Sequence, residues 1–203
     1  MNRSLVALSL ALVLCTAGCS DDGPTDSTLN QNLNFLEPAP DAPALAQQTL
    51  TFTAVQGQDT EVFMWYRRRP ERADSSKLLR FRIRDRAQIV LPNGTPLAAG
   101  QTVQITITVT DPQKLIVDMQ PTGLRFTNDD EPAQLNLWYI EQDHDLNDDG
   151  VINATDASIE QTLAIFRREN VLSPWVRQTS RVIVETDEVE AILHGFSNYV
   201  IAY

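Results

Sequence analysis

The chain has 203 residues, of which 27 are Asp or Glu and 16 are Lys or Arg, so its formal net charge at pH 7 is −11. A balance this acidic argues against nucleic acid as a partner, because neutralising phosphate groups requires a basic surface. The two cysteines, Cys15 and Cys19, lie near the N-terminus. Disulfides, thiol catalysis and cysteine metal sites are therefore excluded from the rest of the sequence.

Residues 1–18 have the pattern of a signal peptide. Arg3 supplies a positive charge, and the mostly apolar run 5–15 is about half the length of a membrane-spanning helix. Thr16-Ala17-Gly18-Cys19 resembles the lipobox of bacterial lipoproteins, which implies cleavage before Cys19, lipid on that cysteine and a membrane as partner through the anchor. Ser20 after the cysteine favours the outer membrane. The alternative is an ordinary secretory signal that is cut nearby.

Residues 19–48 have the composition of a disordered tether. The segment from residue 20 is rich in Asp, Pro, Thr, Asn and Gln, and it has few large apolar residues. Such a composition predicts a loose chain with a reach on the order of 30 Å. Loss of residues 1–18 removes Arg3 and no acid, so the mature chain has 15 basic and 27 acidic residues and a net charge of −12.

From residue 49 to residue 203, apolar and polar residues alternate with a period of two, which predicts half-buried strands. The run 103–109 is the clearest example, with Val or Ile at every second position and Gln or Thr between them. The pattern predicts an all-β domain at 49–203, an antiparallel β-sandwich of about 8–10 strands. The other predicted strands are 50–55, 61–67, 78–84, 115–119, 135–140, 182–185, 189–194 and 199–203.

Several segments resemble the sandwich domain that ankyrins, netrin receptors and zonula occludens proteins share. They are Ile89-Val90-Leu91-Pro92-Asn93-Gly94, the strand 102–110, Gln120-Pro121-Thr122-Gly123-Leu124-Arg125-Phe126, Ala133-Gln134-Leu135-Asn136-Leu137, Trp175 and His194-Gly195-Phe196-Ser197-Asn198-Tyr199. Gly195 and the acidic loop between Tyr139 and Leu163 depart from the family pattern. The resemblance covers about residues 89–203 and implies a sandwich with a structural or interaction role, since the family is not enzymatic. It transfers no site residues.

Four arginines, Arg80, Arg82, Arg84 and Arg86, occupy every second position around the predicted strand 78–84. On a strand their side chains share one face. This face is a candidate site for an anionic glycan, a lipid headgroup or an acidic partner. The alternative is that these arginines pair with carboxylates on neighbouring strands.

Residues 145–156, Asp-Leu-Asn-Asp-Asp-Gly-Val-Ile-Asn-Ala-Thr-Asp, fill every coordinating position of a twelve-residue calcium loop. The expected ligands in loop order are Asp145, Asn147, Asp149, the Val151 carbonyl, Asn153 and Asp156. The loop resembles those of EF-hands and dockerins, which implies bound calcium with a structural role. Asp156 departs from the usual Glu, and the flanks fit strands at 135–140 and 162–167, although a short helix after the loop is also compatible. The alternative is an acidic hairpin turn built on Asp149-Gly150.

Catalytic motifs give no comparable signal. His144 and His194 have no nucleophile at a motif spacing, and Ser197 lacks the context of a nucleophile elbow. The sequence therefore predicts a non-catalytic lipoprotein of the cell envelope. It would present a calcium-stabilised β-sandwich for structural or binding work, with a protein or a glycan as partner. The alternatives are a dockerin-like docking module, although dockerins use two such loops, and an enzyme that acts on envelope polysaccharide.

Overall fold

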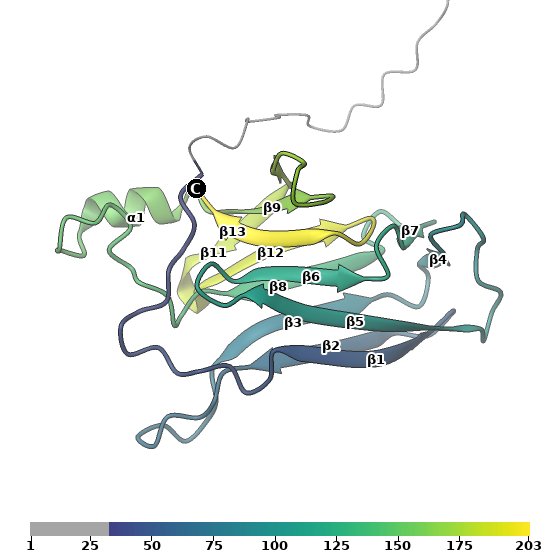
Figure 1. Ribbon diagram of the computed structural model, residues 1–203, viewed down its shortest axis with the longest axis horizontal. Coiled ribbons are helices and arrows are strands. Elements are labelled where there is room, and N and C mark those ends of the chain that lie inside the picture. The colour runs from purple at the N-terminus through teal and green to yellow at the C-terminus, as the bar shows by residue number, and fades with distance from the viewer. Residues whose placement is uncertain (1–32) are drawn as a thin grey trace, which may run out of the picture.

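The computed structural model describes residues 33–203 as two packed antiparallel sheets (Figure 1). In chain order the elements are β1 (Thr49–Val55), β2 (Thr60–Trp65), β3 (Lys77–Ile83), β4 (Gln88–Val90), β5 (Thr102–Asp111), β6 (Ile116–Gln120), β7 (Arg125–Thr127), β8 (Ala133–Trp138), α1 (Ala154–Glu160), β9 (Ala164–Arg168), β10 (Val176–Arg177), β11 (Ser180–Ile183), the 3-10 helix η1 (Val184–Thr186), β12 (Glu188–Leu193) and β13 (Asn198–Ala202). One sheet has six strands in the order β1-β5-β6-β13-β9-β10, and the other has five in the order β11-β12-β8-β3-β2. The remaining two strands, β4 and β7, pair with each other in a small separate sheet. The predicted all-β sandwich is confirmed. The predicted signal peptide, Cys19 and the start of the tether lie outside the described residues.

The number of strands differs from the prediction, since residues 33–203 contain thirteen. Each of the nine predicted runs overlaps a strand. The strands without a prediction of their own are β4, β7 and β10. All three have only two or three residues, too few for an alternating pattern. In the run 182–185 the strand ends at Ile183, because the chain turns into η1 at Val184.

The core lies between the two sheets and follows the predicted alternation. Along β5, Ile105, Ile107 and Val109 are buried while the residues between them are not. The centre holds a cluster of Phe81, Phe126 and Phe196, whose ring centroids lie 5.3 to 6.2 Å apart. Burial of each such side chain stabilises the fold by roughly 1.5–3 kcal/mol. The sandwich is therefore held mainly by apolar packing.

A second, smaller core covers the outer face of the six-stranded sheet. Trp175 packs there with Phe166, Val200 and Ala202, and its ring lies 6.2 Å from that of Phe35. Strand β13 is consequently buried on both faces, which explains its nearly uninterrupted apolar sequence.

Residues 33–48, predicted as the end of a loose tether, instead lie against the sandwich. Phe35 forms a bridge to Ala202, Pro38 to Gln142 and Leu45 to Tyr66. Leu36 is only 3% exposed and belongs to the main core. The folded body therefore begins before residue 49. The proline-rich composition of the segment concealed the few apolar side chains that fix it in place.

Among the residues that the structure describes, no helix combines the length and the apolar character needed to cross a membrane.

Candidate functional site

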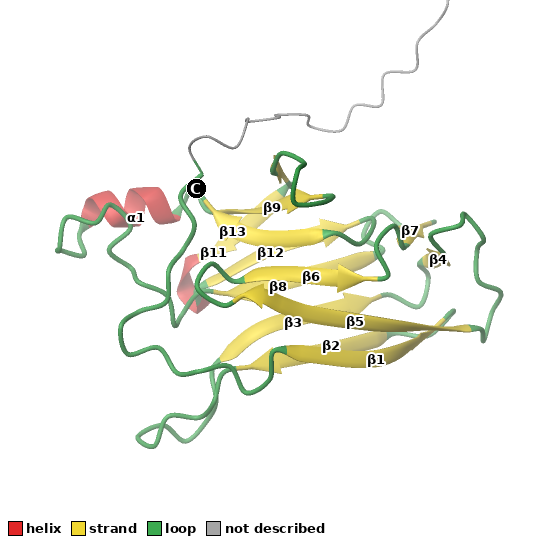
Figure 2. Cartoon of the chain, viewed as in Figure 1, coloured by secondary structure: helices red, strands yellow, loops and turns green. Residues whose placement is uncertain are grey.

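The loop 145–156 lies at one end of the sandwich, where it leads into α1 (Figure 2). The chain leaves β8 at Trp138, and α1 begins at Ala154, the tenth position of the loop. The Asp149-Gly150 pair therefore does not join two paired strands, which contradicts the alternative of a hairpin turn. The short helix that was compatible with the sequence is present. The strand expected over 162–167 follows it as β9.

The first half of the loop is curled around its own side-chain oxygens. The two carboxylate oxygens of Asp145 accept hydrogen bonds from the N–H groups of Asp149 (3.1 Å) and Gly150 (2.7 Å). The Asn147 side-chain oxygen also accepts from Asp149 N–H, and Asp149 accepts from Val151 N–H. Gly150 has φ +84°, a left-handed conformation that glycine adopts without strain. The predicted glycine turn is therefore present at loop position six.

Asp156 closes the loop from its far end. Its side chain is 2% exposed and accepts hydrogen bonds from the N–H groups of Leu146 (2.8 Å), Asn147 (3.2 Å) and Asn153 (2.8 Å). These backbone donors, Asn153 foremost, hold the pKa of Asp156 below its ordinary value of 3.8. Asn153 and Asp156 also form a capping box at the start of α1. The carboxylate at position twelve is thus fixed facing the beginning of the loop.

The six predicted ligand residues share one curled loop and offer oxygen ligands of the kind that hard cations prefer. Among residues 33–203, however, Asp145, Asp149 and Asp156 do not bring three ligand atoms within 4.8 Å of one another. The amide nitrogen of Asn153 donates to the Val151 carbonyl (2.8 Å), and that of Asn147 donates to Asp149 (3.0 Å). These two NH₂ groups therefore bind oxygens that the prediction assigns to a cation. The ligand types suit a hard cation, but to bind one these two amides would have to turn away and the three carboxylates would have to move closer together.

A second group of metal-ligating side chains lies beside the loop. His144, Glu160 and Asp187 each offer one ligand atom, and the three atoms lie within 4.8 Å of one another. His144 directly precedes the loop, Glu160 ends α1, and Asp187 follows η1. All three are half-buried. Burial raises the pKa of Asp187, with the charge of Glu160 adding to the rise and His144 opposing it.

Tyr139 contacts all three members of this triad. Its hydroxyl donates to Glu160 (2.9 Å), its ring centroid lies 5.9 Å from that of His144, and its N–H donates to the backbone carbonyl of Asp187 (2.8 Å). Tyr139 is 2% exposed. Burial, followed by the hydrogen bond to Glu160, raises the pKa of the Tyr139 phenol, so the hydroxyl stays protonated and donates at neutral pH.

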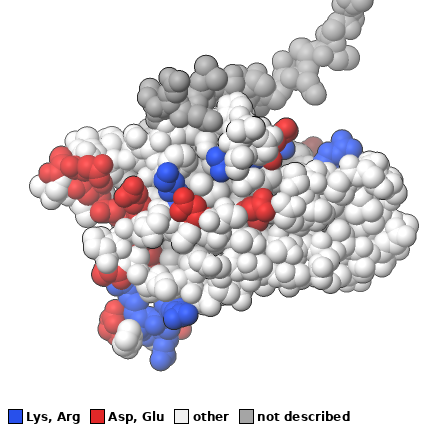
Figure 3. All heavy atoms as spheres, viewed as in Figure 1, with Lys and Arg blue, Asp and Glu red and all other residues white. Residues whose placement is uncertain are grey.

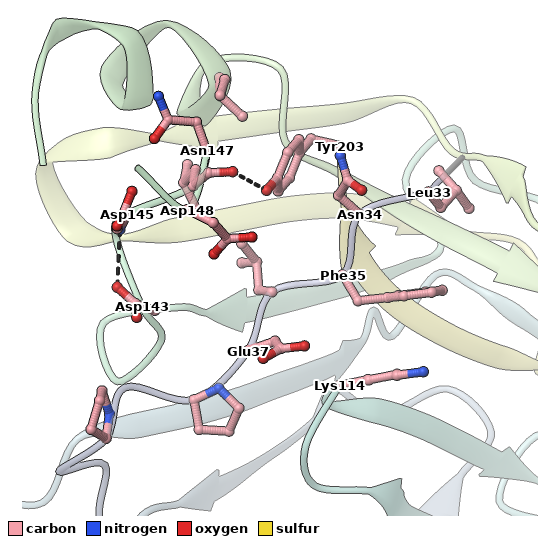
Figure 4. Close-up of a pocket in the computed structure, with 15 residues that line it drawn as sticks. Leu33, Asn34, Phe35, Glu37, Lys114, Asp143, Asp145, Asn147, Asp148 and Tyr203 are labelled. Carbon is pink, nitrogen blue, oxygen red and sulfur yellow. Dashed lines mark hydrogen bonds between the residues drawn. The ribbon is translucent and has the colours of Figure 1, made fainter. Parts of the chain in front are cut away.

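An open groove of about 680 Å³ runs between the loop and the segment that enters the sandwich (Figure 4). Asp145 and Asp148 line one side, and Asn34 and Phe35 line the other. Tyr203 lies between the two sides and donates a hydrogen bond from its hydroxyl to the carbonyl of Leu146. The loop, the entering segment and the residue that follows β13 therefore meet in one place.

The four arginines of the candidate anion-binding face are each paired with a carboxylate. Arg80 binds Glu61 (2.6 Å), Arg82 binds Asp59, Arg84 binds Glu131 (2.5 Å) and Arg86 binds Asp129 (3.2 Å). This arrangement agrees with the alternative in which neighbouring acids neutralise the face. On the face shown in Figure 3, acidic side chains gather at the α1 end, and basic side chains gather at the loop between β2 and β3.

The sequence prediction missed the triad. A histidine directly before an Asp-rich loop was the one available signal, because imidazole beside carboxylates is a common metal-binding combination. Glu160 and Asp187 had no local signal, since only the fold brings Asp187 to the end of α1. No family model, curated protein or solved structure matches this chain. The β-sandwich that the resemblance implies is present. Membership of the family that ankyrins, netrin receptors and zonula occludens proteins share stays a prediction.

Proposed function

We propose that the protein is a non-catalytic lipoprotein of the cell envelope, anchored through Cys19 and stabilised by calcium in the loop 145–156. The observation that supports the proposal is the local fold of the loop, in which Asp145 accepts hydrogen bonds across the turn at Gly150 and Asp156 accepts from the backbone near the loop start. The same twelve-residue loop carries three carboxylates, Asp145, Asp149 and Asp156, and a divalent cation bound between them would offset their mutual repulsion.

Calcium would act where the anchored chain joins the body. Asn34 and Tyr203 exchange two backbone hydrogen bonds of 3.1 Å, and Asp143 N–H donates to the Glu37 carbonyl (2.8 Å). Tyr203 in turn binds the loop through Leu146. A cation that fixes the loop would therefore also fix the segment that leads from the membrane. In this role calcium would stiffen the end of the sandwich where the entering segment at Asn34 meets the loop 145–156.

The sandwich would then be presented to a protein or glycan partner of the envelope, with the outer membrane as the expected location. The family resemblance supports an interaction role. The ion pairs along Arg80, Arg82, Arg84 and Arg86 argue against that face as the main anion-binding surface, because each guanidinium already has a carboxylate partner.

Thermal unfolding of the full chain in detergent, with millimolar calcium against excess chelator, tests the calcium site. Saturation at about 100 times Kd stabilises by about 2.7 kcal/mol, which corresponds to a rise in Tm of roughly 5–10 °C. The double variant Asp145→Ala with Asp149→Ala should lose this rise. Asp74→Ala with Asp130→Ala removes the same charge from two exposed positions outside the loop and should keep it. Identical curves for the wild-type chain in calcium and in chelator would rule out the site.

A further inference from the structure

The triad of His144, Glu160 and Asp187 differs from the loop in chemistry. It combines one imidazole nitrogen with two carboxylates, whereas the loop offers oxygen donors alone. Calcium takes six to eight oxygen ligands and has little use for imidazole. Zinc and related first-row ions bind imidazole and carboxylate together at about 2.0–2.2 Å.

The spacing of the triad approaches that of such a site. Ligand atoms in a tetrahedral zinc shell lie about 3.4 Å apart, and the three atoms here already lie within 4.8 Å of one another. The three residues belong to separate segments, the loop entry, the end of α1 and the end of η1. Their meeting is a product of the tertiary fold and not of local sequence crowding.

Tyr139 provides an independent observation, because metal ligands are commonly oriented by a surrounding set of hydrogen bonds. The Tyr139 hydroxyl fixes the Glu160 carboxylate at 2.9 Å, and its ring flanks His144 at 5.9 Å. Its N–H holds the backbone of Asp187, which adopts a left-handed conformation with φ 50°. One buried residue thus contacts all three candidate ligands, Glu160 and His144 through its side chain and Asp187 through its backbone N–H.

We propose that His144, Glu160 and Asp187 form a second metal site that binds a zinc-class divalent cation. Two carboxylates neutralise the charge of the ion, and a neutral imidazole completes three protein ligands. A fourth position remains for water or for a donor from a partner. The site is chemically separate from the calcium loop, so it stands or falls independently of the calcium proposal.

Zinc titration of the tag-free, chelator-stripped full chain in detergent tests the site, with millimolar calcium present to occupy the loop. Isothermal titration calorimetry should show one zinc bound per chain. Substitution with Co²⁺ should give the visible absorption spectrum of a low-symmetry metal site. His144→Ala, Glu160→Gln and Asp187→Asn should each weaken zinc binding at least about 100-fold. His194→Ala removes the other histidine of the chain, which is exposed, and should leave zinc binding unchanged.

Two further arms separate the outcomes. Near-ultraviolet circular dichroism establishes that each variant is folded, and the isosteric Glu160→Gln and Asp187→Asn keep the test open if His144→Ala unfolds. The loop variant Asp145→Ala with Asp149→Ala should still take up one zinc per chain. Absence of zinc binding, loss with His194→Ala equal to that with His144→Ala, or loss in the loop variant with retention in the triad variants would each overturn the proposal.

Discussion

The hydroxyl of Tyr203, just after β13, donates a hydrogen bond to the carbonyl of Leu146, the second residue of the loop 145–156. The backbone of Tyr203 is paired at the same time with that of Asn34. A single residue therefore links the candidate calcium loop to the segment that enters the sandwich. Order in the loop and order at this entry point are expected to rise and fall together.

Tyr203→Phe removes this hydroxyl and leaves the Leu146 carbonyl without its donor. The expected cost is about 1 kcal/mol, which lowers Tm by roughly 2–4 °C. Hydrogen exchange should become faster at Asn34 and in the loop. Tyr199→Phe is the matched control, since its hydroxyl binds the Gly195 carbonyl on another part of the sandwich. Equal exchange at Asn34 in both variants would contradict the proposed link.

Glu141→Ala tests the most deeply buried ion pair. The Glu141 side chain is 1% exposed and accepts hydrogen bonds from Arg69, Arg72 and Ser76. Removing it leaves Arg69, whose side chain is 16% exposed, with Asp41 as its remaining carboxylate partner. The expected cost is roughly 1.5–3 kcal/mol, measured by denaturant unfolding. Glu131→Ala, which breaks the exposed pair with Arg84, should cost less than about 1 kcal/mol. Similar losses in the two variants would show that burial does not decide the cost.

The fold was largely predictable because its strands have one buried face. Alternation in β1, β3, β5 and β12 marks that face directly in the sequence. The two-residue β10 carries too little pattern. The docking of Leu36 was hidden, because its burial depends on contacts with residues far along the chain.

The two candidate sites also differ in how far the sequence alone predicts them. A calcium-type loop draws its ligands from consecutive positions, so Asp145 to Asp156 were recognisable from spacing alone. The triad draws Asp187 from a segment 27 residues beyond Glu160. Its assembly required β12 to pair with β8, where Glu188 lies opposite Trp138. When strand pairing brings the ligands together, their sequence positions follow no fixed spacing that could be recognised.

Acid titration should reveal the contribution of Asp156. Its folded-state pKa lies below the ordinary value of 3.8 because backbone N–H groups bind the carboxylate. The stabilisation is therefore present above about pH 4 and is lost as pH falls through the lower folded-state pKa. In chelator, the difference in Tm between the wild-type chain and Asp156→Asn should shrink below pH 4. The corresponding difference for the exposed Asp130→Asn should stay small, and a constant difference for Asp156→Asn would contradict the assignment.

Cys19→Ala should separate the anchor from the fold. Cys19 precedes the described residues 33–203, so the sandwich should keep its Tm while the chain leaves the membrane fraction. Cys15→Ala lies within the predicted signal peptide and should leave membrane attachment unchanged. Fractionation after a high-salt wash measures both variants. Retention of the Cys19→Ala chain in the washed membrane would mean that lipid on this cysteine is not the anchor.

Tyr139→Phe tests whether Tyr139 is a positioning residue for the triad. The variant keeps the ring beside His144 and the N–H bond to Asp187, and it removes only the hydroxyl that binds Glu160. Zinc affinity should fall about tenfold with one zinc still bound. All three ligands remain, but Glu160 loses the hydrogen bond that orients it.

A control and a double variant distinguish this effect from a general loss of stability. Tyr66→Phe also removes a buried hydroxyl, one that accepts from Gln142 at 3.0 Å, and should leave zinc affinity unchanged. If the hydroxyl acts through Glu160, Tyr139→Phe should add no further loss in the Glu160→Gln background. Equal and additive losses in both backgrounds would instead place the effect of Tyr139 outside its bond to Glu160.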